Sequence, residues 1–172
     1  NMINELCPNG VEFKKLGEVL GYEQPTRYIV NSSDYKSEGT PVLTAGQSFI
    51  LGYTDETNGI YKADKDNPVI IFDDFTTSFH WVNFNFKIQS SAMKMLRPKT
   101  DEVVFRFVYY AMKCIDYTPG EHSRQWISKY SDFEIPVPPL AVQSKIVEIL
   151  DNFTELEAEL EAELEAELEA RK

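Results

Sequence analysis

The sequence predicts a mixed α+β domain followed by one long C-terminal α-helix. Short apolar segments separated by Gly, Pro and Asn fill the first part of the chain, which is typical of strands and turns. Apolar residues at helical spacing appear only after Pro98. After Pro139 the chain contains no further Gly or Pro and is rich in Leu, Ala and Glu, which all favour helix. We therefore assign residues 1–138 to the domain and residues 139–172 to the helix.

Strands are expected where apolar residues alternate with polar ones or form short runs. Apolar and polar residues alternate over residues 82–89, which predicts one half-buried strand. Asn58-Gly59 is a strong turn signal. The other predicted strands, of which the wholly apolar run at 69–72 is expected to be buried, are residues 11–16, 28–30, 41–44, 49–51, 69–72 and 92–96.

A first helix is expected before Pro119. Thr100 is its predicted N-cap, and the acidic residues Asp101 and Glu102 suit the positive end of a helix. Apolar residues follow at helical spacing until Pro119 and the glycine after it end the element.

The second helix is expected to begin at Pro139, because proline suits the first helical turn. Its apolar residues first alternate gaps of three and four, like a coiled-coil seam. They then recur every four residues as leucines, so the stripe turns by about 40° per repeat. The preceding domain is too small to cover this stripe, so we expect the helix to pair with another helix as an antiparallel coiled coil. The predicted dimerisation residues are Val142, Ile146, Ile149, Leu150, Phe153, Leu156, Leu160, Leu164 and Leu168.

Composition limits the possible functions. The 172 residues are 42% hydrophobic, with eleven Phe and nine Tyr, which is enough for a folded core. The net charge is −11, and eight Glu follow Thr154 against only Arg171 and Lys172. Nucleic-acid-binding proteins usually display a basic surface. DNA binding by this chain would therefore need a local basic face or positive charge from partner subunits.

The sequence favours a cytoplasmic protein. Cys7 and Cys114 form no CxxC pair, so two free thiols are expected, with a single disulfide as the alternative. No apolar run reaches the roughly 18 residues that a membrane span needs, and no signal peptide opens the chain. Asn1 precedes Met2, which indicates either a cloning remnant or a piece of a longer chain.

Two patterns that suggest catalysis or metal binding are interpreted as structural. Glu12-x-Lys14 is half of a common nuclease constellation, but no Asp stands upstream at a suitable distance. Asp73-Asp74 with His80 nearby has the right atoms for a metal ion, yet a loop edge with satisfied carboxylates is the preferred interpretation. Neither a Gly-rich cofactor loop nor the Asn-Pro-Pro-aromatic tetrapeptide of methyltransferases occurs. We therefore predict no catalytic residue, no metal and no cofactor.

Four blocks of the chain resemble the specificity subunits of type I restriction–modification systems. They are Val-Glu-Phe-Lys-Lys-Leu-Gly-Glu-Val at 11–19, Gln-Trp-Ile-Ser at 125–128, Ile-Pro-Val-Pro-Pro-Leu at 135–140 and Gln-Ser-Lys-Ile-Val-Glu-Ile-Leu-Asp at 143–151. The Glu-Leu-Glu-Ala repeats resemble the spacer helix of that family. A full subunit of the family has two target recognition domains and two long helices. This chain has material for one of each, so it resembles half a subunit.

The resemblance implies a non-catalytic protein that recognises a bipartite DNA target. Its implied partners are double-stranded DNA, a methyltransferase subunit, a restriction subunit and a second copy of itself, with no membrane partner. Each recognition domain would read one half-site, and the paired helices would set the distance between the domains. The alternative is a protein-interaction adaptor that dimerises through an acidic coiled-coil helix.

Three polar segments are the best candidates for contacting DNA. Segment 121–129 carries Arg and Gln, which make bidentate contacts to guanine and adenine, and Ser hydroxyls suited to phosphates. The second segment is the hydroxyl-rich loop 76–81, and the third is 44–48. Trp126 is expected to pack in the core. The predicted DNA-binding residues are Ser123, Arg124, Gln125, Lys129, Thr76, Thr77, Ser78, His80, Gln47 and Ser48.

Overall fold

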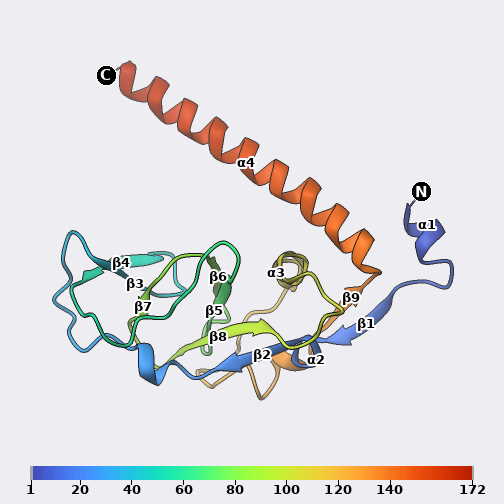
Figure 1. Cartoon of the computed structure of the whole chain (residues 1–172), viewed down its shortest axis with the longest axis horizontal. Helices are drawn as coiled ribbons and strands as arrows, with labels where there is room; N and C mark the ends of the chain where they lie inside the picture. Colours follow the sequence, from blue (N-terminus) through green and yellow to red (C-terminus); the bar gives the residue numbers. More distant parts are fainter. Residues whose placement is uncertain (1, 172) are drawn as a thin grey trace.

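A four-stranded antiparallel sheet forms the centre of the domain in the computed structural model, which describes residues 2–171 (Figure 1). Its strand order is β2 (Leu20–Glu23), β8 (Met93–Pro98), β5 (Val69–Asp73) and β6 (Phe79–Val82). Strand β5 is buried on both faces, since Ile70 and Phe72 belong to one apolar cluster and Val69 and Ile71 to the other. This double burial explains the unbroken apolar run and confirms the prediction of a buried strand at 69–72.

A second sheet of three strands packs beside the first. It consists of β4 (Ile50–Thr54), β3 (Thr40–Leu43) and β7 (Lys87–Ile88), with β3 and β7 parallel. The prediction of one strand over 82–89 is therefore wrong, because β6 ends at Val82 and the chain crosses to the other sheet. The alternating pattern predicts that Lys87 faces solvent, but its side chain is buried, where it pairs with Glu56 at 2.9 Å.

The segment predicted as a strand at 28–30 is also different in the structure. Pro25 starts a 3-10 turn, η1 (Pro25–Tyr28), because its fixed φ suits the first residue of a helical turn. Only Ile29 then makes an isolated bridge, to Ile88.

The helices are short except for the last. They are α1 (Met2–Leu6), α2 (Leu16–Val19), α3 (Phe105–Lys113) and the 3-10 turn η2 (Tyr130–Asp132). The predicted N-cap of α3 at Thr100 is wrong: the Thr100 hydroxyl accepts a bond from the Glu102 N–H within a turn, and the helix begins five residues later. None of the helices among residues 2–171 combines the length and apolar content needed to cross a bilayer.

The long helix α4 (Leu140–Ala170) begins directly after Pro139, as predicted. It follows β9 (Glu134–Val137), which pairs with β1 (Glu12–Lys15) and so ties the two ends of the domain together. Figure 1 shows α4 starting at this end and slanting back over the length of the domain, with its C-terminal end furthest from the sheets. The predicted mixed α+β fold with one long C-terminal helix is confirmed.

Two contacts fix the first turns of α4 on the domain. Val142 and Gln143 are buried, and the Gln143 amide accepts one backbone N–H and donates to two backbone carbonyls. Three turns on, the Arg106 guanidinium of α3 donates to Asp151 at 2.9 Å. Beyond Asp151 every residue of the helix is exposed. The helix therefore leaves the domain in a direction set by its first three turns.

Candidate nucleic-acid interface

The structure brings the three predicted DNA-contact segments to one region of the domain. His80 Nε2 donates to the Gly46 carbonyl at 3.0 Å, and the His80 ring stacks on Phe49 with 4.5 Å between centroids. Phe75 stacks on His122 at 4.6 Å. Residues 75–80, which form the loop after β5 and the start of β6, therefore contact both the 44–48 loop and the 121–129 segment.

An open hollow of about 420 Å³ lies between two of these loops and α3. Lys113, at the end of α3, and Tyr117 line it together with predicted residues. Lys129 does not line the hollow but contacts one of its residues, since its ammonium lies 4.9 Å from the centre of the Tyr117 ring. Sequence reasoning missed Lys113 and Tyr117, whose only signals are a basic last turn of a helix and an aromatic residue after it. The residues that line the hollow are Ala45, Gly46, Gln47, Thr77, Ser78, Phe79, His80, Met112, Lys113, Ile115, Tyr117 and Tyr130.

A buried carboxylate holds the 121–129 segment in place. Asp74 Oδ1 accepts the backbone N–H groups of Gln125 (3.2 Å) and Trp126 (2.8 Å), and Asp74 Oδ2 accepts Lys94 (3.2 Å) and Arg124 (3.0 Å). The Asp74 side chain is 1% exposed and that of Lys94 2%. Burial alone would raise the pKa of the Asp74 carboxyl, but hydrogen bonds from the Trp126 N–H and the two cations outweigh it and hold this pKa below its usual range.

The loop between β5 and β6 is a tight turn built by carboxylate and backbone contacts. Asp73 accepts the N–H groups of Phe75 and Thr76 at 2.8 and 3.0 Å. Thr77 adopts φ = +62°, a left-handed conformation that costs energy for a β-branched residue. Asp74 thus has both carboxylate oxygens bonded, as the structural interpretation expected, and Asp73 has one. Among residues 2–171 no group of three or more His, Cys, Asp or Glu is placed to hold a metal ion.

The ten predicted DNA-binding residues differ in how they face solvent. Gln125 is 2% exposed, and its amide is bonded to Tyr117 and Ser123, so it reaches DNA only if these bonds break. Thr77 is also buried, at 8% exposed. Ser78, His80 and Ser123 are half-buried, and the exposed ones are Gln47, Ser48, Thr76, Arg124 and Lys129. Trp126 packs in the core against Phe72, as predicted.

Two exposed lysines at this surface have no acidic partner. Among residues 2–171, neither Lys113 nor Lys129 has a carboxylate within 4 Å, whereas Arg124 pairs with Asp74. The region therefore combines free positive charge, hydroxyls and an exposed amide on an otherwise acidic protein. Such a combination suits phosphates through the cations and base edges through the amide.

Comparison with known proteins places this geometry in a family. The profile of the type I restriction modification DNA specificity domain matches residues 8–170. Over 159 residues the chain is 54% identical to the Escherichia coli protein named type I restriction enzyme EcoR124I/EcoR124II specificity subunit, covering 86% of this chain and 39% of that protein. Over 156 residues it is 29% identical to a putative type I restriction enzyme specificity subunit of Haemophilus influenzae, covering 85% and 38%.

Solved structures show the same fold. The HsdS subunit from Thermoanaerobacter tengcongensis matches with a TM-score of 0.56 and 22% identity, over 92% of this chain and 42% of that one. The S subunit of the type I restriction–modification system from M. genitalium matches with a TM-score of 0.60 and 19% identity, over 90% and 43%. This chain spans less than half the length of its curated relatives. Because the family match covers nearly all of it, the chain belongs to the family of type I restriction modification DNA specificity domains.

Proposed function

We propose that this chain is a non-catalytic subunit that recognises a DNA sequence and directs type I methyltransferase and restriction subunits to it. Family membership and the specificity-subunit name of its E. coli relative support this proposal. The structural observation that carries it is the convergence of three polar segments on one surface with two unpaired lysines. The proposed setting is the cytoplasm, with no metal and no cofactor.

We infer a division of labour along the chain. Residues 1–138 form the recognition domain, and residues 139–172 form a spacer helix that also joins two copies. The stripe on α4 supports this assignment, because its large apolar side chains are exposed to solvent. Val142, one of the predicted dimerisation residues, is buried against the domain, so we assign it to anchoring α4 on its own domain and not to contact with a second helix. The large apolar side chains of the exposed stripe, each 45–71% exposed, are Ile149, Phe153, Leu156, Leu160, Leu164 and Leu168.

Charge favours an antiparallel pair of helices. In a parallel pair the Glu-rich ends of both helices would lie side by side and repel. In an antiparallel pair each acidic end lies next to the first turns of its partner instead. A two-fold axis between the copies then places the two recognition domains at opposite ends of the rod. Two identical domains related in this way recognise an inverted repeat.

Placing a lysine in the leucine stripe should dissociate the dimer. Leu164→Lys removes from both copies a leucine that the proposed dimer would bury, so we expect the dimer dissociation constant to rise about 100-fold or more. Sedimentation velocity over a concentration series measures this change. Ala162→Lys is the matched control, because residue 162 lies about 200° around the helix from Leu160 and faces away from the stripe. A wild-type chain that stays monomeric at high micromolar concentration would contradict the proposed dimer.

The recognition surface is tested by the sequences that become methylated. The chain is co-purified with its methyltransferase subunit, and methylated sites are sequenced. We expect Gln47→Ala to relax one base position, since a good bidentate contact contributes about 1–3 kcal/mol of discrimination. We expect Lys129→Gln to weaken binding to all sequences equally and to flatten the salt dependence by about one unit of slope.

Lys36→Gln is the control, because Lys36 already pairs with Asp55 at 3.8 Å and lies outside the surface. Methylation that is independent of sequence in the wild-type complex would overturn the proposed function. Duplex binding with no salt dependence would favour the adaptor alternative.

A further inference from the structure

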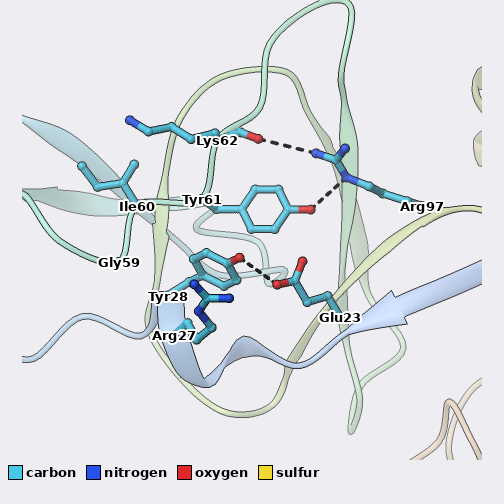
Figure 2. A pocket seen from close by; sticks show the side chains of 8 residues that line it. All are labelled: Glu23, Arg27, Tyr28, Gly59, Ile60, Tyr61, Lys62 and Arg97. Carbon is cyan, nitrogen blue, oxygen red and sulfur yellow. Dashed lines mark hydrogen bonds between the residues drawn. The ribbon is translucent and has the colours of Figure 1, made fainter.

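A second group of unpaired cations lines a different hollow of the domain. The hollow has a volume of about 750 Å³ and lies between β2, η1, β8 and the loop at 59–62 (Figure 2). Arg27, Lys62 and Arg97 line it with Glu23, so its charged lining is net positive on a chain of net charge −11. Among residues 2–171, none of these three cations has a carboxylate within 4 Å. Arg27 and Lys62 are exposed, whereas Arg97 is half-buried, so Arg97 is the cation whose position the fold determines.

The Arg97 guanidinium is held in place by neutral groups. Its Nε donates to the Tyr61 hydroxyl at 2.9 Å and its Nη2 to the Lys62 carbonyl at 3.5 Å, and the guanidinium carbon lies 5.4 Å from the centre of the Tyr61 ring. Figure 2 shows these two bonds at one side of the hollow. A guanidinium has five N–H donors, and these bonds occupy two of them. These two bonds fix the orientation of the guanidinium, so its remaining three N–H groups already have a set direction when no ligand is bound.

Glu23 is the one carboxylate among the residues that line the hollow, and its partner is a neutral group. The Tyr28 hydroxyl donates to Glu23 Oε1 at 2.7 Å. Burial, together with the neighbouring Glu23 carboxylate, raises the pKa of Tyr28 to about 12, so this hydroxyl keeps its proton at neutral pH. Tyr28 therefore positions Glu23 without changing its charge, and three cations against one carboxylate leave the lining net positive.

The wall of the hollow is a rigid turn. Gly59 has φ = +62°, and a Cβ there would lie 2.3 Å from the Arg27 carbonyl oxygen, so only glycine allows this close approach. The buried Lys87 fixes the same turn by donating to the Asn58 carbonyl at 2.8 Å and pairing with Glu56 at 2.9 Å. The Asn58-Gly59 turn predicted from the sequence thus positions the backbone that carries Lys62.

We infer that this hollow, which we call the Arg97 cradle (Glu23, Arg27, Tyr28, Gly59, Ile60, Tyr61, Lys62 and Arg97), binds a phosphate group. The guanidinium of Arg97 is already oriented and keeps unused N–H donors, and it lies in a hollow whose charged lining is net positive, which suits a tetrahedral oxyanion. The phosphate is supplied either by the backbone of bound DNA or by a free phosphate compound. Binding of a DNA phosphate rests on the proposed function, whereas binding of a free phosphate compound is independent of it.

The first experiment uses inorganic pyrophosphate and the full ¹⁵N-labelled chain. At constant ionic strength, we expect saturable chemical-shift changes at the amides of 59–62 and at the Arg97 Nε. Arg97→Gln should weaken binding about tenfold or more, the usual scale of a charged hydrogen bond. Tyr61→Phe should also weaken it severalfold, because it releases the guanidinium while the net charge and the ring stay the same. Lys36→Gln removes one charge elsewhere and should have no effect.

The second experiment identifies the source of the phosphate. Binding of a random-sequence fluorescent duplex is measured over a salt series. If DNA supplies the phosphate, Arg97→Gln reduces the slope of log affinity against log salt by about 0.9, and Lys36→Gln leaves it unchanged. Pyrophosphate binding with an unchanged slope assigns the cradle to a free phosphate compound.

The inference is overturned if pyrophosphate does not bind and the slope stays the same. It is also overturned if Lys36→Gln has the same effect as Arg97→Gln, since the effect would then be one of overall charge. Failure of the proposed function is a different result, namely methylation without sequence preference by the wild-type complex. The pyrophosphate measurement does not depend on that outcome.

Discussion

Replacing Asp74 with Asn should destabilise the domain by about 3–5 kcal/mol, the usual effect of removing one member of a buried ion pair. The substitution keeps the shape of the side chain but leaves Lys94, whose side chain is 2% exposed, without its negative partner. It also turns one acceptor oxygen into a donor beside the N–H groups of Gln125 and Trp126 or beside the two cations. Urea unfolding of the full chain measures the change.

Two further variants separate charge from shape. Asp73→Asn is the matched control, because Asp73 neighbours Asp74 but, among residues 2–171, its side chain bonds only to two backbone N–H groups of its own turn, through one oxygen. It should cost about 1 kcal/mol. Adding Lys94→Met to Asp74→Asn should recover part of the lost stability, since it removes the buried charge that had no partner. A loss in Asp73→Asn as large as that in Asp74→Asn would show that the buried ion pair is not the cause.

The same carboxylate should give the domain a measurable acid sensitivity. The folded-state pKa of Asp74 lies below the unfolded value, so its ionised form contributes stability at all pH values above the unfolded pKa. That contribution falls as the pH drops from the unfolded pKa, about 3.9, and is lost once the pH passes the folded pKa. Asp74→Asn should therefore unfold with a shallower dependence on pH in this acidic range, as measured by urea titrations at successive pH values.

The contacts around Asp74 also show why the sequence predicted which segments meet in space but not which of their side chains face solvent. Hydroxyls, Arg and Gln in polar segments identified three loops that do meet in space. Whether a given side chain faces solvent depends on partners far away in the chain. Arg124 and Gln125 are neighbouring polar residues in the sequence. Arg124 is exposed, whereas Gln125 is buried and its amide is hydrogen-bonded to Tyr117 and Ser123. No local pattern encodes that difference.

Long-range contacts explain the errors in the fold prediction as well. Lys87 reads as the solvent-facing member of an alternating strand, but Glu56 and the Asn58 carbonyl make a buried position favourable for it. Thr100 has the sequence of an N-cap, but the Val104 N–H is bonded instead to Gln143, 39 residues further on. Strand β5 and helix α4 were predictable, since an apolar run and a long stretch without Gly or Pro depend on few distant partners.

Deleting one Leu-Glu-Ala-Glu repeat, Leu160 to Glu163, should shorten the spacer of the methylated target without changing either half-site. Four residues of helix span about 6 Å, which is less than two base-pair steps of 3.4 Å, so we expect a spacer shorter by one or two base pairs. The deletion rotates the domain by only about 40°, because four residues make slightly more than one turn. The first three turns of α4, which hold the domain through Gln143 and Asp151, stay intact.

A second deletion distinguishes repeats that set the distance between the half-sites from repeats that form only a tail. Deleting three residues, Leu160 to Ala162, shortens the helix almost as much but turns the stripe about 60° in the opposite direction. It breaks the leucine register, so this control should lose dimerisation and methylation where the four-residue deletion keeps both. An identical spacer in wild type and four-residue deletion would mean that the repeats do not set the distance. A changed half-site would mean that α4 also shapes the recognition surface, because the only elements altered lie beyond its contacts with the domain.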